Sequence, residues 1–494
     1  MSLPLKSLVF ATVLIFCLTL AYFTVRNYTI ETLLDRAPTK SNLLDLDRIA
    51  PNNPFVSAAL GRLYQYSAED YDLQQAIAHY QRASAANPYD SGTWQNLAKA
   101  YEASGLVGEA ARALQNATAA APSSTAVHWS MANFLVRNAS DPTLLTAGLM
   151  SSDAPIDNAP TTNRVDRSKE TMEGSTKFEI PARLNGILLE ELRRTIDLDS
   201  NSLTGALSLA SHAGIDPRIT YRTVVPANAP EQFAAINWFA AMKEWDTATL
   251  GWDSLSNSGN PFDIQQTLPY IDALISNDRI FEANATWSRA LSLTHYLEAT
   301  LYRTALDPIG SGSYSRSTGN TPDLSHSTQN LIFNPTFSRE PLNGGFDWRI
   351  FDTREAPVRI DKQTFLKNRR SLRIEFTGSS NLDFAHVYQY VPVRPSTPYD
   401  FSVWLKTQGI NTDHGLYFEI IDIHLASRTP QSAAVLFQTT QLLGDNEWTE
   451  LNQQFTTGPS THLLVVRLRR SPSPKFDNLI KGRVWIGNVM LVER

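Results

Sequence analysis

A few side chains near the C-terminal end of the chain have the types that catalysis or metal binding requires. His414, Asp422 and His424 lie close together in the sequence and offer nitrogen and oxygen ligands. If this segment is a strand, Asp422 and His424 share one face, and no third ligand follows at the spacing of a known metal site. We therefore expect solvated or structural roles for these residues, no bound metal and no cofactor.

The sequence lacks the motifs that mark common active sites. It contains no G-x-S-x-G nucleophile elbow, no P-loop, no H-E-x-x-H zinc motif and no dinucleotide fingerprint. Paired carboxylates for glycoside hydrolysis leave no local signature, because they come from distant strands. We therefore expect a non-catalytic protein with no catalytic residues. An enzyme with an unrecognised site stays open as an alternative.

Composition excludes several classes of protein. The chain has 494 residues and a net charge of −6, and its 10 Trp, 17 Tyr and 22 Phe supply more apolar area than a disordered chain carries. The acidic balance gives no reason to expect nucleic acid as a partner. Cys17 is the one cysteine, so no intrachain disulfide forms. Acidic residues outnumber basic ones before residue 330 but not after it, which predicts a domain boundary near that position.

An apolar segment at the N-terminus indicates that the protein is targeted to a membrane. Residues 8–25 carry no charge and would span about 27 Å as a helix, close to the thickness of the bilayer's hydrocarbon core. The segment is long for a cleaved signal peptide, and Thr19-Leu20-Ala21 is a poor cleavage site. We expect an uncleaved single-pass anchor in a bacterial inner membrane, with the bulk of the chain in the periplasm. A cleaved signal is the alternative.

Two stretches of 34 residues, 57–90 and 91–124, repeat one pattern of small, aromatic and proline residues. The matching positions are Leu60, Leu63, Tyr64, Ala76, Tyr80, Ala83 and Pro88 in the first copy, and Trp94, Leu97, Ala98, Ala110, Leu114, Ala117 and Pro122 in the second. Small residues let paired helices approach closely, and proline ends the second helix of each pair. The pattern resembles the tetratricopeptide repeat family, which implies a stack of helix pairs that docks protein partners.

Further helices follow, interrupted by two polar segments. Residues 183–199 have the apolar spacing of one amphipathic helix. Residues 231–295 repeat an Ala/Trp pattern at a shift of 35 and predict degenerate repeats. Residues 151–182 predict a surface insertion, with a partner-binding loop as the alternative. Residues 307–329 are rich in Gly, Ser and Thr and predict a flexible linker.

After the linker, the hydrophobic period changes from 3.6 to 2, which predicts strands. The expected strands are 370–376, 387–393, 399–407, 416–423, 433–441, 448–457, 462–470 and 482–492. So many short strands in about 165 residues predict a β-sandwich or jelly roll. Arg467, Arg469 and Arg470 are interpreted as charges of a solvated edge strand, with binding of an acidic polysaccharide as the alternative.

The C-terminal segment 330–494 resembles the jelly-roll carbohydrate-binding modules that accompany xylan- and glucan-degrading enzymes. The resemblance rests on NLIFNPTF (330–337), GGFDW (344–348), the block 387–407 and the closing GRVWIGNVMLV (482–492). It implies a glycan ligand. That family commonly holds a structural calcium through acidic residues after the opening motif and in the last strand. Here these positions carry Ser338 and Ile486-Gly487-Asn488, so we expect no calcium.

Alternation along the strands sorts the candidate glycan contacts. Sugar sites pair aromatic rings with polar side chains, because sugars present weakly apolar faces and hydroxyl groups. The candidates are Trp404, Tyr388, Tyr390, Tyr417 and Glu419. A shared exposed groove for Trp404, Tyr388 and Tyr417 would favour glycan binding. We expect Trp348, Trp448 and Trp485 to lie in the core.

Together these patterns predict a multidomain α + β protein with a transmembrane helix, an α-helical solenoid of tetratricopeptide-like repeats and a C-terminal all-β jelly-roll sandwich. The expected segments are 1–30 (anchor), 50–150 (repeats), 151–182 (insertion), 183–306 (degenerate repeats), 307–329 (linker) and 330–494 (sandwich). The expected function is that of a non-catalytic, extracytoplasmic adaptor. It would dock envelope proteins through the repeats and bind a glycan through the sandwich, in polysaccharide synthesis, export or envelope assembly. The alternative is a pure assembly scaffold whose sandwich has no glycan ligand.

Overall fold

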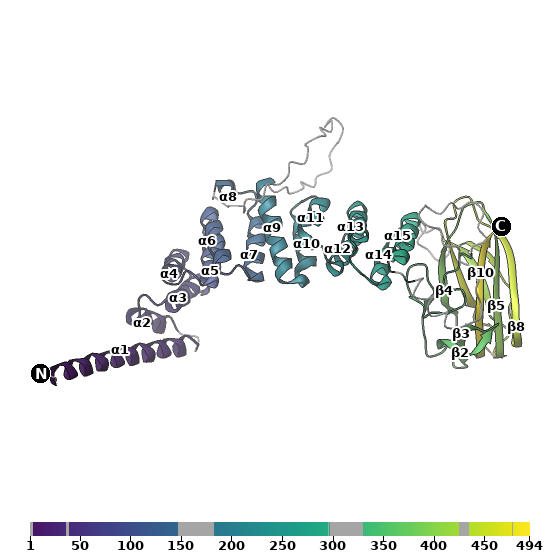
Figure 1. Cartoon of the computed structure of the whole chain (residues 1–494), viewed down its shortest axis with the longest axis horizontal. Coiled ribbons are helices and arrows are strands. Elements are labelled where there is room, and N and C mark those ends of the chain that lie inside the picture. The colour runs from purple at the N-terminus through teal and green to yellow at the C-terminus, as the bar shows by residue number, and fades with distance from the viewer. Residues whose placement is uncertain are drawn as a thin grey trace, which may run out of the picture. The chain divides into compact units, whose positions relative to one another are not determined.

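The computed structural model describes residues 3–35, 39–146, 182–294, 296, 330–423, 434–476 and 478–494. Contacts group the chain into two compact units, Met1–Ala235 and Ile236–Arg494. Helices come first along the chain and two β-sheets follow (Figure 1). The division falls inside the helical region and not near residue 330, since the last helices contact the sandwich. The expected linker 307–329 and, apart from Ala182, the expected insertion 151–182 lie outside the described residues.

The first unit is helical. Its elements are α1 (Leu3–Asp35), α2 (Lys40–Ile49), α3 (Pro54–Tyr66), α4 (Leu73–Ala86), α5 (Ser91–Ala103), α6 (Val107–Ala120), α7 (Thr125–Arg137), α8 (Pro142–Thr146), α9 (Ala182–Leu198), the 3₁₀ turn η1 (Ser200–Ser202), α10 (Leu203–His212) and α11 (Pro217–Val224); α12 (Ala229–Ala241) crosses into the second unit. The expected pairs are confirmed: α3 packs on α4 and α5 on α6. Both α4 and α6 end two residues before a proline, as predicted.

Small residues explain how the paired helices approach one another. Ala76 and Ala83 on α4 are almost fully buried, and Tyr80 between them is completely buried. The ring of Tyr80 lies against Gly61 of α3, where an added Cβ would come within 2.7 Å of the ring. The Tyr80 hydroxyl donates to Gln65 Oε1 at 2.8 Å, which fixes the ring in place. A glycine is therefore required at position 61.

Helix α1 is the one helix in the described part of the chain that is long and apolar enough to cross a membrane. Its window Val9–Arg26 has a mean hydropathy of 2.0 and is 0% buried. Length and composition alone fit an anchor or a signal sequence equally. Its C-terminal end differs, because Ile30 is buried and Leu34 packs beside it in an apolar cluster with residues of α2 and α3, including Leu43 and Val56. The last turns of α1 therefore belong to the folded helical unit.

The second unit joins three complete helices to a sandwich of two five-stranded antiparallel sheets. The helices are α13 (Trp245–Ser258), α14 (Ile264–Ser276) and α15 (Ile280–Leu293). Sheet A has the strand order β1 (Arg349–Ile350), β4 (Phe384–Pro392), β9 (Leu463–Arg470), β6 (Tyr417–Asp422), β7 (Ala434–Gln438). Sheet B has the order β2 (Val358–Leu366), β3 (Arg369–Thr377), β10 (Lys481–Glu493), β5 (Pro398–Ile410), β8 (Gly444–Thr456). The predicted all-β sandwich is confirmed.

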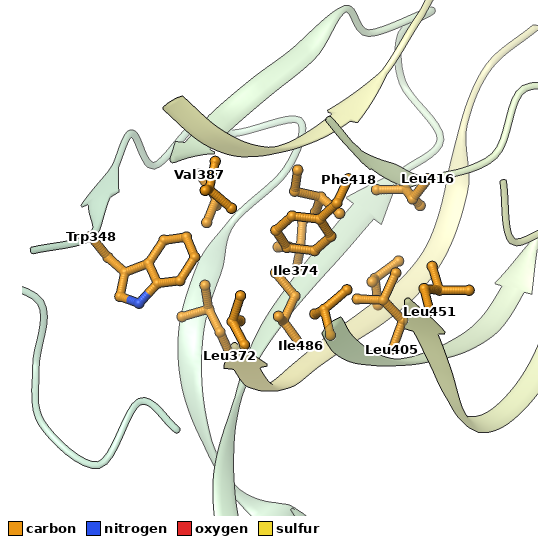
Figure 2. Packing of buried hydrophobic residues seen from close by; sticks show 14 of the residues in the cluster. Trp348, Leu372, Ile374, Val387, Leu405, Leu416, Phe418, Leu451 and Ile486 are labelled. Carbon is orange, nitrogen blue, oxygen red and sulfur yellow. The ribbon is translucent and has the colours of Figure 1, made fainter. Parts of the chain in front are cut away.

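The inner faces of the two sheets share one apolar core. Figure 2 shows Val387 and Phe418 of sheet A with Ile374, Leu405 and Ile486 of sheet B. Trp348 closes one end of the core and is completely buried, as predicted. Because side chains alternate along a strand, the neighbours of these core residues point outward from each sheet. The outer faces are therefore the surfaces on which the sandwich can display a site.

Candidate functional site

The outer face of sheet A brings together four of the five predicted glycan contacts. On β4, Tyr388 and Tyr390 point outward while Gln389 between them is buried in the core. On β6, Tyr417 and Glu419 lie on the side opposite the core residues Phe418 and Ile420, and both side chains are buried on that side. The alternation predicted along both strands is thus confirmed.

The central strand of sheet A supplies a residue between these two pairs that the sequence analysis interpreted wrongly. Arg467 of β9 is the register partner of Tyr388 on one side and of Glu419 on the other. Arg467 and Arg469 therefore lie in mid-sheet and not on a solvated edge, and Arg470 is completely buried. The sequence showed the alternation of these arginines, but strand order depends on long-range pairing that it did not reveal.

Glu419 is a carboxylate buried on this outer face, and it has polar partners on two neighbouring strands. Its side chain is 3% exposed. Its Oε1 accepts from Arg467 Nε at 2.5 Å and lies 3.6 Å from Arg469 Nε. Its Oε2 accepts from Gln438 Nε2 at 3.1 Å. A buried charge needs such pairing, since leaving it unpartnered costs several kcal/mol. The face thus carries a fixed polar cluster of definite geometry.

Beside the polar cluster lies an aromatic cluster. The Tyr388 and Tyr390 rings meet edge to face with centroids 5.6 Å apart, and Phe351 stacks on Tyr388 at 6.1 Å. The Arg349 guanidinium lies over the Tyr390 ring, 5.1 Å from its centroid. Burial raises the pKa of Tyr388 above its ordinary value. Phe351 and Arg349 were missed, because β1 is only two residues long and has no readable period.

The structure separates Trp404 from the other four candidates. Trp404 is on β5, in sheet B, and its neighbours Val403 and Leu405 face the core, so its ring points away from sheet A. There it packs under Lys367, whose Nζ lies 5.0 Å from the ring centroid. Trp404 therefore shares no groove with Tyr388 and Tyr417, because alternation places a residue on one side of its strand but does not say which sheet the strand joins.

The other tryptophans of sheet B have mixed burial. Trp485 is buried, but it alternates with core residues and so lies on the outer face of sheet B and not in the predicted core; its Nε1 donates to Asp361 Oδ2 at 2.6 Å. Trp448 is only half-buried on β8, near Gly487 of β10, so the prediction that it lies in the core is wrong. Neither side chain lies on the face that carries the tyrosines.

Among the described residues, no group of three or more His, Cys, Asp or Glu side chains could hold a metal ion. Asp422 Oδ2 accepts from the Thr461 hydroxyl, and His414 Nδ1 lies 3.2 Å from the Ser471 carbonyl oxygen; His424 is outside the described residues. The calcium positions of the resembled family do not suit a cation either. Arg370 donates to the Ser338 carbonyl at 3.5 Å, and Arg369 to Asn488 Oδ1 at 3.4 Å. Guanidinium groups contact the oxygens that a metal would need.

The loop before sheet A holds one strongly perturbed carboxyl. Asp347 is completely buried, and this burial raises its pKa to about 6, although its oxygens accept from the backbone N–H groups of Leu342 and Trp348 at 2.9 and 2.7 Å. Those bonds shape the loop that leads into β1. The carboxyl therefore has a structural role in the loop that precedes Arg349.

These features define a class of protein: helical repeats followed by a sandwich with an aromatic and polar outer face. Residues 67–133 match the family model of the tetratricopeptide repeat. That part of the chain is a tetratricopeptide-repeat region, as predicted. No curated protein matches the chain at a significant level.

Solved structures similar to the chain come from both expected families. A family 4 carbohydrate-binding module is 13% identical, covers 33% of this chain and 99% of its own, and gives a TM-score of 0.25. A family 22 xylan-binding domain from Paenibacillus barcinonensis is 12% identical over 30% of this chain and 91% of its own, with a TM-score of 0.23. The tetratricopeptide-repeat protein YrrB, described as having an unusual peptide-binding site, is 10% identical over 53% and 97%, with a TM-score of 0.23. At these TM-scores the likenesses carry no argument about function.

Proposed function

We propose that this protein is a non-catalytic adaptor that binds a glycan on the outer face of sheet A and docks protein partners through its tetratricopeptide repeats. The observation that carries the glycan proposal is one surface on which Tyr388 and Tyr390 lie beside the buried Glu419–Arg467 pair. The rings can stack on the apolar faces of sugars, while fixed polar groups bond to hydroxyls. The outer face of sheet B also carries aromatic and charged groups, so the test below includes a variant on each sheet.

We further propose that α1 anchors the adaptor in a bacterial inner membrane and that the rest of the chain lies in the periplasm. The support is the apolar window Val9–Arg26, which is 0% buried. Such an adaptor would serve polysaccharide synthesis, export or envelope assembly by holding a glycan near the proteins that its repeats dock.

The test is glycan binding by the full-length protein in a detergent without a sugar headgroup. Soluble xylans, β-glucans and the host's own exopolysaccharide are titrated, and heat is recorded by calorimetry. Replacing Tyr390 by Ala is expected to weaken binding roughly tenfold, because a stacked ring contributes about 1 kcal/mol or more. Trp404→Ala is the matched control: it removes an aromatic ring from the opposite sheet and should leave affinity unchanged.

Other outcomes decide between the proposed adaptor and its rival. If Trp404→Ala abolishes binding and Tyr390→Ala does not, the site lies on sheet B. If a folded wild-type protein binds none of the glycans, the sandwich is a structural part of an assembly scaffold. The repeats would then be the functional surface.

A further inference from the structure

The helices of the second unit contribute a side chain to the glycan-binding face proposed above. Asp272 of α14 forms a two-point ion pair with Arg349 of β1: Nη2 donates to Oδ1 at 2.5 Å, and Nη1 donates to Oδ2 at 3.2 Å. Asp272 Oδ1 also accepts from the backbone N–H of Gly345 at 2.8 Å. Residues 272 and 349 are 77 positions apart, and both lie in the compact unit Ile236–Arg494.

Packing around this ion pair fixes its geometry. The ring of Trp287, on α15, meets Phe333 at 5.1 Å and Phe346 at 6.2 Å between centroids. Gly345 has a φ of +56°, and an added Cβ would come within 2.6 Å of Trp287. Only glycine therefore fits at position 345, where the loop passes against the Trp287 ring. The helix pair is therefore seated closely on the segment that leads into β1.

Arg349 links this contact to the proposed site. Its side chain is 13% exposed, and its guanidinium lies over Tyr390 while its register partner is Tyr388. An arginine stacked on a ring and held by two hydrogen bonds has one orientation. Asp272 thus determines where Arg349 sits, and Arg349 covers one face of the ring that stacks on sugar in the proposal.

The charges on this face are balanced within the protein. Arg467 pairs with Glu419, Arg469 pairs with Asp383, and Arg349 pairs with Asp272. Two of these carboxylates belong to the sandwich and the third belongs to the helices. An acidic polysaccharide is recognised by cations that have no internal partner, whereas a charge-balanced aromatic face suits an uncharged glycan.

We propose that Asp272 is a positioning and specificity-determining residue of the glycan face, and that the face selects uncharged polysaccharides because Asp272 neutralises Arg349. This inference rests on the proposed function. It makes α14 and α15 part of the binding unit, so a fragment that starts at residue 330 lacks one of the groups that set affinity and selectivity.

The test uses the full-length protein and three variants, with xylohexaose and cellohexaose as uncharged probes and an oligogalacturonate of equal length as the acidic probe. Asp272→Asn keeps an oxygen for the Gly345 N–H but removes the charge. It is expected to weaken binding of the uncharged probe about three- to tenfold, since Arg349 loses its charged anchor. It should also strengthen binding of the acidic probe, because one cation is freed.

Two further variants separate positioning from folding. In the double variant Asp272→Asn/Arg349→Gln the gain for the acidic probe should disappear, because no free cation remains. Asp278→Asn is the matched control: it makes the same substitution at an exposed position in the turn after α14 and should change neither affinity.

Each remaining result contradicts the proposal in an identifiable way. Unchanged affinities in Asp272→Asn would overturn it. Equal losses for both kinds of probe, together with a lower melting temperature, would make Asp272 merely structural. A wild-type protein that binds none of the probes and no glycan of the wider panel would remove the proposed function itself, whatever the variants do.

Discussion

At the scale of single residues, one buried histidine has two acceptors at once. His128 Nδ1 lies 2.6 Å from Glu191 Oε2, and Nε2 lies 2.9 Å from the Pro122 carbonyl oxygen. A neutral imidazole has a single N–H and can donate to only one of them, whereas the imidazolium donates to both. The hydrogen bond to Glu191 raises the pKa of His128 above 6.5, although burial and Arg194 oppose this.

This pair predicts a pH-dependent stability of the first unit. Because the pKa of His128 is higher in the folded protein than in the unfolded one, its contribution is fully present below about pH 6.5 and is lost as the pH rises through the folded value. Glu191→Gln is therefore expected to lower the melting temperature clearly at about pH 5.5, corresponding to roughly 1–2 kcal/mol, and much less at about pH 8.5. An equal loss at both values would show that the imidazolium form contributes nothing.

A second prediction concerns the buried carboxylate of sheet A. Glu419→Gln leaves Arg467 and Arg469 without their shared charge partner, and we expect a loss of about 2 kcal/mol, moderated because Arg467 is 30% exposed. Hydrogen exchange of β6 and β9 amides measures this locally. Asp383→Asn is the control, because Asp383 is 59% exposed and its pair with Arg469 should contribute less than about 1 kcal/mol. Equal effects of the two variants would contradict this ranking.

At the scale of elements, two helical glycines are expected to respond to alanine in opposite directions. In Gly61→Ala the new methyl group meets the immobile ring of Tyr80 at 2.7 Å, so overpacking of about 1–3 kcal/mol should outweigh the gain in helix propensity. In Gly108→Ala the nearest atom would be Thr143 Cβ at 3.7 Å, an ordinary contact, so roughly 0.5 kcal/mol of stabilisation is expected. Urea unfolding of both variants measures this; a stabilised Gly61→Ala would mean that Tyr80 can move.

The strands and helices also show why parts of the fold could be predicted from the sequence and other parts could not. Strands β3 to β10 were predicted because alternation is local, and the helix pairs because small residues recur at a fixed period. Strand β1 was missed because two residues have no period, and β2 was missed because its buried positions, Val358, Asp361 and Leu366, do not alternate. The outward direction of Tyr390 followed from its strand, but its neighbours Arg467 and Arg349 come from strands that pair at long range. The contact between Asp272 and Arg349 leaves no local trace at all.

At the scale of the whole molecule, the packing of the end of α1 against α2 and α3 leads to a prediction about the membrane anchor. Ile30 is buried among residues of α2 and α3, and it lies only four residues, or about 6 Å of helix, beyond the apolar window. Deleting residues 2–26 should therefore release the protein from membranes without lowering its melting temperature. Membrane fractionation and the intact mass of the native protein test the anchor; a mass that lacks residues 1–21 would show cleavage instead.

The position of the last strand has a consequence for biosynthesis. β10 ends at Glu493 and pairs with β3 on one side and β5 on the other, so it is the central strand of sheet B. Until residues 481–493 leave the ribosome, the nascent chain therefore holds β2–β3 and β5–β8 as two separate strand pairs of sheet B. Sheet B can close only after these residues have emerged, and a chain that stops before Lys481 cannot complete the core.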